Sequence, residues 1–86
     1  MTQELPEPSF EVLVEQLRIQ AALQLGQVPN PLTGEAQLAP DRARFTIGLL
    51  EALRETTRGN LSGEQSEFLA ETLERLQGRL AEIEGA

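Results

Sequence analysis

Apolar residues recur at helical spacing in three stretches of this 86-residue chain. In residues 63–83 the large aliphatic residues lie four, three, four and three positions apart, which places them on one narrow side of a helix. Residues 10–25 and 41–58 repeat every three or four positions over wider arcs. The pattern predicts three helices and no strand, which is an all-α fold. The residues of the narrow stripe are Leu69, Leu73, Leu76, Leu80 and Ile83.

Capping residues indicate where the first two helices begin and end. Ser9 is a good N-cap for the first helix, and Gly26 follows its last apolar residue as a helix-terminating glycine. Asp41 fits the start of the second helix as a cap or a first-turn acid, and Gly59 fits its end. We therefore expect helices over about 10–25 and 41–58.

The third helix begins with a capping box. Ser62 is the expected N-cap and Gln65 stands three positions later, where its amide can bond back to the cap. The short link over 59–62 predicts that the second and third helices form an antiparallel hairpin. Residues 1–8, with two prolines and two glutamates, are expected to be a flexible acidic tail before a single helical domain over 9–86.

The connection over residues 26–40 is unusually long for a compact domain, and such loops are often functional. Its prolines and glycines are typical of turns. One interpretation is a crossover without a function, anchored by Leu32 and Leu38. The other is a loop that faces a partner. Its candidate contact residues are Pro29, Asn30, Pro31, Thr33, Gly34 and Glu35.

The first helix carries apolar residues on two opposite sides. One side includes Phe10, Leu13, Val14, Leu17, Ala21 and Leu25. Val12, Ile19 and Leu23 form the other, about half a turn away. A three-helix monomer covers only one of these sides, and isolated surface hydrophobics are otherwise common. We expect Val12, Ile19 and Leu23 to form an interface, and Ile19→Asp to dissociate it.

Two occupants of that interface remain open. A small domain gains missing burial most simply by self-association, which predicts a homodimer closed through the first helix. The alternative is an adaptor that binds a different protein through the same side of that helix. The stripe of the third helix has its own alternative as a docking surface, but burial inside the hairpin is the expected use of an amphipathic helix.

The second helix is apolar over a wider arc than the other two. Ala43, Ile47 and Leu50 lie on one side of this arc, and Phe45, Leu49, Ala52 and Leu53 lie on the other. Gly48 and Gly78 fall within predicted helices, where each costs about 1 kcal/mol relative to Ala. Both lie on predicted polar arcs, where nothing in the sequence explains them.

Composition argues against catalysis. The chain has no His, Cys, Tyr, Trp or Lys, so the usual activated nucleophiles and soft-metal ligands are missing. Carboxylates at helical spacing remain, but a solvated helix face does not shift their pKa values as acid–base catalysis requires. We therefore expect no catalytic residue, no cofactor and no metal, and a non-catalytic module for interaction or regulation.

The charge constrains the partners and the location. A net charge of −7 repels phosphate backbones and anionic membranes, so neither nucleic acid nor membrane is an expected partner. No stretch approaches the roughly 20 apolar residues of a membrane span. The acidic start and the lack of Cys lead us to expect a cytoplasmic protein whose partner is itself or another protein.

Two segments together resemble a known family. Residues 25–35, LGQVPNPLTGE, are similar to a motif LGxxPxPxTGE, and residues 56–62, TTRGNLS, resemble a segment ending in T-basic-G-N-L-S/T. Both are typical of the small bacterial family called domain of unknown function eighteen-forty-four. The resemblance implies a small all-helical bacterial protein without an assigned activity, and it supplies no catalytic residue. Gly48 departs from the polar residue expected there, and Gln65 replaces an acid.

Overall fold

The structure is a computed structural model that describes residues 5–85. It contains three α-helices, α1 over Phe10–Gln24, α2 over Pro40–Thr56 and α3 over Gly63–Gly85. Within the described residues the only β-type pairing is a single bridge between Leu25 and Leu38. The all-α prediction is therefore confirmed. Residues 5–8 of the expected tail are exposed and have no helix or strand, and residues 1–4 lie outside the described residues.

The predicted caps of α1 and α3 are present. The Ser9 hydroxyl accepts a hydrogen bond from the Val12 amide at 3.1 Å. Ser62 and Gln65 form the reciprocal capping box, with amide-to-side-chain distances of 3.1 and 3.0 Å. Gly26 follows α1 with a φ of +72°, a conformation that glycine adopts without strain. Local sequence signals therefore fix three of the helix ends.

The start of α2 agrees with the prediction and its end differs. Asp41 is the first-turn acid, one of the two roles expected for it, while Ala39 is the N-cap residue and Pro40 occupies the first turn, where its missing N–H costs nothing. The helix ends at Thr56 rather than Arg58, because the chain turns at Thr57. The Thr57 amide and hydroxyl both donate to the Leu53 carbonyl, at 3.0 and 2.7 Å.

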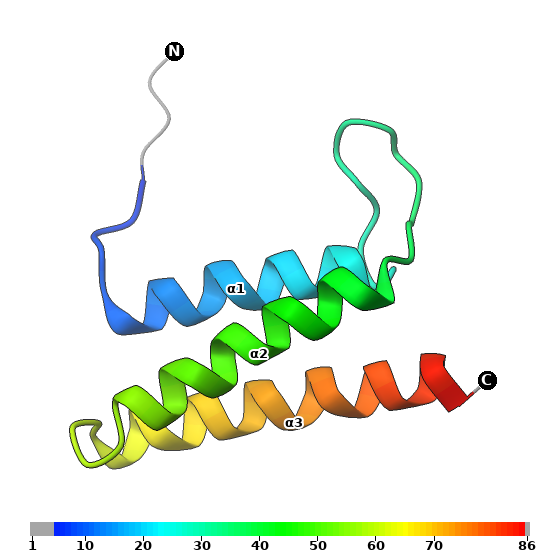
Figure 1. The fold of residues 1–86 in the computed structure, drawn as a ribbon. Helices are drawn as coiled ribbons and strands as arrows, with labels where there is room; N and C mark the ends of the chain where they lie inside the picture. Colours follow the sequence, from blue (N-terminus) through cyan, green and yellow to red (C-terminus); the bar gives the residue numbers. More distant parts are fainter. Residues whose placement is uncertain (1–4, 86) are drawn as a thin grey trace.

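The helices form a thin assembly, with α2 lying across α1 and α3 (Figure 1). Its principal extents are 43, 37 and 17 Å. The Gly59–Ser62 link joins α2 to α3 as the expected antiparallel hairpin, whereas the connection between α1 and α2 stands away from the helices (Figure 1). A flat molecule leaves much of each helix at the surface.

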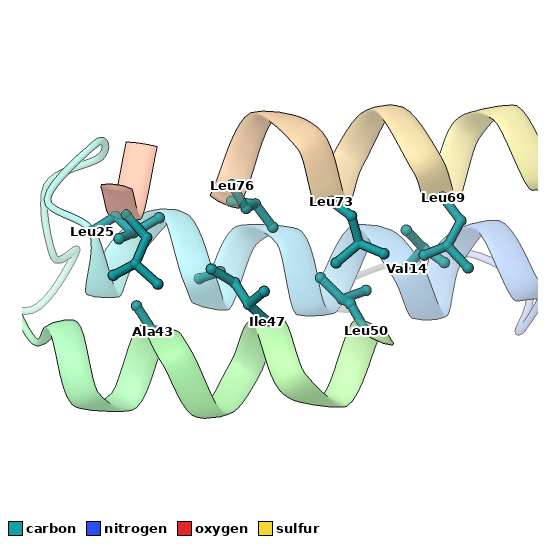
Figure 2. Packing of buried hydrophobic residues seen from close by; sticks show 10 residues of the cluster. Val14, Leu25, Ala43, Ile47, Leu50, Leu69, Leu73 and Leu76 are labelled. Atoms are coloured by element: carbon teal, nitrogen blue, oxygen red, sulfur yellow. The ribbon is translucent and has the colours of Figure 1, made fainter. Parts of the chain in front are cut away.

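A single hydrophobic core joins all three helices. Side chains from α1, α2 and α3 converge between the ribbons (Figure 2). The leucine stripe of α3 belongs to this core, as predicted, and Ile83 packs at its edge. The core residues are Val14, Ala21, Leu25, Ala43, Ile47, Leu50, Leu69, Leu73, Leu76 and Leu80.

Part of the predicted core lies at the surface. Leu13 belongs by periodicity to the buried side of α1, yet it is 47% exposed. The wide apolar arc of α2 is also divided. Its Ala43–Ile47–Leu50 side is buried, whereas Phe45 and Leu49 are 67% and 38% exposed. The cause is the crossing of the helices, because α2 has only α1 and α3 to cover its apolar arc.

Candidate interaction surface

The charged residues of α1 lie toward α3. Glu11 accepts a hydrogen bond from the Gln65 amide of α3 at 2.8 Å. Glu15 and Arg18 pair with each other and line a shallow pocket together with residues of α3. The hydrogen bond from Arg18 holds the pKa of the Glu15 carboxyl below its usual value. The rest of α1 carries no charge, and between Arg18 and Asp41 the only charged residue is Glu35.

The side of α1 toward α2 is polar but uncharged. The buried Thr46 hydroxyl of α2 accepts a hydrogen bond from the Gln20 amide at 3.2 Å. It also lies 2.7 Å from the Gln24 side-chain oxygen and 3.1 Å from the Arg42 carbonyl, either of which can accept its proton. This cluster shows which side of α1 faces α2. Thr46 lies within the buried arc of α2, so the sequence pattern could have identified it as a buried polar residue.

Leu13 and Gln16 belong to that same side of α1, because they precede Gln20 by seven and four residues. Both are exposed. On α2, the exposed positions Phe45, Leu49 and Ala52 recur four and three residues apart and form a stripe. Together, Leu13, Gln16, Phe45, Leu49 and Ala52 make a surface without charges, which we call the uncharged face.

The charged residues at the two ends of the uncharged face are mostly paired. Asp41 accepts a hydrogen bond from Arg44 at 3.0 Å, and Glu55 accepts one from Arg58 at 2.6 Å. Arg58 also lowers the pKa of the Glu55 carboxyl through this hydrogen bond. Arg42 stands beside Asp41 at the N-terminal end of α2. An apolar surface enclosed by paired charges is the usual anatomy of a protein contact.

The three residues expected to form the interface on α1 differ in exposure. Ile19 is 43% exposed, whereas Val12 and Leu23 are half-buried. Leu23 lines a small pocket together with Asn30 and other residues of the connection, which accounts for part of its burial. The second apolar side of α1 therefore exists, with Ile19 as its most accessible member.

The connection between α1 and α2 is organised around Asn30. The Asn30 side-chain oxygen accepts from the Leu32 amide at 2.8 Å. The Asn30 carbonyl accepts from the amides of Thr33 and Gly34 at 3.2 and 2.7 Å, and its own amide donates to the Glu35 carbonyl at 2.9 Å. Asn30 is half-buried, and its hydrogen bonds fix the loop rather than face outward.

The other candidate residues of the connection, Pro29, Pro31, Thr33, Gly34 and Glu35, are exposed. Leu32 and Leu38 do not anchor the loop, since they are 92% and 61% exposed. The loop is held by its backbone instead. Leu25 and Leu38 form the bridge, and the Ala39 amide donates to the Gln24 carbonyl at 2.7 Å. Prediction from hydrophobicity alone missed this backbone clamp.

A hollow along α3 is open to solvent and has a volume of about 980 Å³. Its walls alternate carboxylates and guanidinium groups, and Gly78 leaves one wall without a side chain. Among residues 5–85, no three acidic, His or Cys side chains gather as metal ligands would. Within the same residues no helix is both long and apolar enough to cross a membrane. The uncharged face is thus the surface with the clearest physical character.

Comparison with known proteins gives one match. No curated protein and no solved structure is similar enough to this chain to match it. The family model described as a domain of unknown function, DUF1844, matches residues 7–82. That match covers all of α1 and α2 and most of α3, including both motifs around the two connections. The chain therefore belongs to the DUF1844 family.

Proposed function

We propose that this protein is a non-catalytic interaction or regulatory module that acts as a homodimer. The observation that carries the proposal is the separation of charge from apolar surface. Residues 62–86 contain six Glu and two Arg, whereas the uncharged face spans α1 and α2. Two copies with a charge of −7 each repel one another wherever their acidic surfaces approach. The uncharged face lets them meet with their acidic residues farther apart, which reduces that cost.

The extent of the surface supports the same proposal. The chain exposes 6307 Å². A compact monomer of 9.5 kDa exposes about 5,050 Å² by the usual scaling with mass. The exposed residues 5–9 and the connection account for part of the difference, and the thin helical assembly contributes as well. A stable interface buries about 800 Å² of each partner.

The first experiment measures the mass in solution by size-exclusion chromatography with light scattering at micromolar concentration. We expect twice the 9.5 kDa of the chain. Ile19→Asp tests whether the contact also includes the second apolar side of α1, which lies outside the uncharged face, because a carboxylate buried in an apolar contact must be desolvated. We expect it to shift the protein toward the monomer. Leu32→Asp, on the exposed connection, is the matched control and should leave the mass unchanged.

A wild-type monomer under these conditions would contradict the homodimer. It would favour a second candidate, an adaptor that binds a different protein through the exposed side of α1. The accessibility of Ile19 on that side supports this candidate. Circular dichroism of each variant separates loss of association from loss of helix.

A further inference from the structure

We propose that α2 lies on the two-fold axis of the dimer and packs antiparallel against α2 of the second copy. This inference rests on the proposed homodimer and specifies its geometry. Phe45, Gly48, Leu49 and Ala52 occupy positions i, i+3, i+4 and i+7 of α2. Four residues at this spacing form the corners of one diamond on a helix surface.

The diamond is complementary to itself. A two-fold axis through its centre places each corner against the diagonally opposite corner of the second copy. Phe45 then lies against Ala52 of the second copy, and Leu49 lies against Gly48 of the second copy. Each large side chain meets a small one, which is the condition for close packing of two helices. No other antiparallel register of two α2 helices pairs both large residues with both small ones.

Gly48 leaves room in the diamond for a side chain of the second copy. It is exposed in the middle of α2, and a methyl group added there would meet no atom of its own chain within 4 Å. The fold therefore gives no reason for a glycine at a position where it weakens the helix. An approaching helix supplies that reason, because the Leu49 side chain of the second copy needs the space.

The charges around the diamond also favour a second copy of the chain. The diamond carries no charge, and the ion pairs Asp41–Arg44 and Glu55–Arg58 flank it. Arg42 and Glu51, three residues before Phe45 and three after Gly48, are the other charged neighbours of the diamond on α2. A surface that is neutral and matched in shape to itself fits a second copy of the chain. Leu13 of α1 extends the contact at its edge.

Cross-linking through an engineered cysteine tests the axis directly, because the natural chain has no Cys. A residue beside a two-fold axis lies near its own symmetry mate, and a disulfide forms when the two Cα atoms are within about 7 Å. Leu49→Cys should give a covalent dimer under mild oxidation. Leu32→Cys, which replaces a leucine on the connection, is the matched control and should remain uncross-linked.

Substitutions at the diamond give an independent readout. Phe45→Asp should raise the dissociation constant of the dimer by about a hundredfold or more, as loss of a central aromatic contact does. Gly48→Ala should raise it by about tenfold. Gly78→Ala is the matched glycine control, since Gly78 also lies exposed in a helix with open space around it, and it should leave association unchanged.

The outcomes separate this inference from the proposed function. If the wild type is a monomer, both are wrong. If the wild type is a dimer but Leu49→Cys fails to cross-link and Phe45→Asp leaves the dimer intact, the homodimer stands and α2 is not on its axis. Circular dichroism is the control for folding. We expect Phe45→Asp to keep its helices, because Phe45 is 67% exposed.

Discussion

Gly26 illustrates how a single residue determines a connection. Its φ is +72°, and a Cβ at this position would lie 3.0 Å from the Leu38 side chain and 3.2 Å from the Gln37 carbonyl. Gly34 has almost the same φ, +73°, but has open space around it. A side chain at either position would therefore strain the backbone, whereas it would meet a neighbouring residue only at position 26.

We predict that Gly34→Ala lowers the free energy of unfolding by about 1 kcal/mol, through its left-handed conformation alone. Gly26→Ala should lower it by about 1–3 kcal/mol more, because the added methyl group displaces Leu38 or the strand-like backbone beside it. Urea denaturation of the two variants measures the difference. Equal losses would show that Leu38 moves aside without cost.

Thr46 shows how one polar residue aligns two helices. It is fully buried on α2, and its hydroxyl is bonded to side chains of Gln20 and Gln24 on α1. Thr46→Val keeps the shape and removes these bonds. We predict a loss of about 1–2 kcal/mol in the free energy of unfolding, measured by urea denaturation.

Thr72→Val is the control for Thr46. Thr72 is also buried, but its hydroxyl donates only to the Phe68 carbonyl of the same helix, at 2.8 Å. Loss of that bond leaves a carbonyl that still accepts a backbone hydrogen bond within α3, so the loss of stability should be smaller. If both variants lose the same stability, the contact between α1 and α2 does not depend on the Thr46 cluster.

At the level of the elements, the sequence predicts the helices well because their ends carry local signals. Ser9, Gly26 and the Ser62–Gln65 box act over three or four residues, and the structure contains all of them as expected. The end of α2 differs, since the helix stops at Thr56 although Gly59 indicated an end at about residue 58.

The candidate surface could be predicted only in part. Helical periodicity shows that Leu13 and Phe45 lie on apolar arcs, but an arc wider than its neighbours must leave some residues uncovered. Which residues remain exposed depends on how α2 crosses α1 and α3, and this arrangement is a property of the whole core. Ile19 is exposed on the second apolar side of α1, as expected, whereas Val12 and Leu23 on that side are half-buried.

For the whole molecule, charge and association are coupled in a measurable way. Each copy carries −7, and the proposed contact contains no ion pair. Salt screens the repulsion between the copies and strengthens apolar contacts. We predict that raising NaCl from about 0.02 M to about 0.5 M lowers the dissociation constant of the dimer by about threefold or more.

Sedimentation equilibrium at several salt concentrations provides this measurement. A dimer held by ion pairs would respond in the opposite direction and dissociate as salt increases. Such a result would place the contact on the charged side of α3 rather than on the uncharged face. The sign of the salt effect therefore decides between the two surfaces without any substitution.

The backbone clamp at the base of the α1–α2 connection has a practical consequence. Since the Leu25–Leu38 bridge and the bond from Ala39 to Gln24 hold the two ends together, the helices do not depend on the length of chain between them. Lengthening a loop whose ends are already closed adds little entropic cost. An epitope or a fluorophore-binding peptide could therefore be inserted next to Leu32 to detect the intact protein in its host. The insertion would lie on the connection and outside the proposed contact on α2.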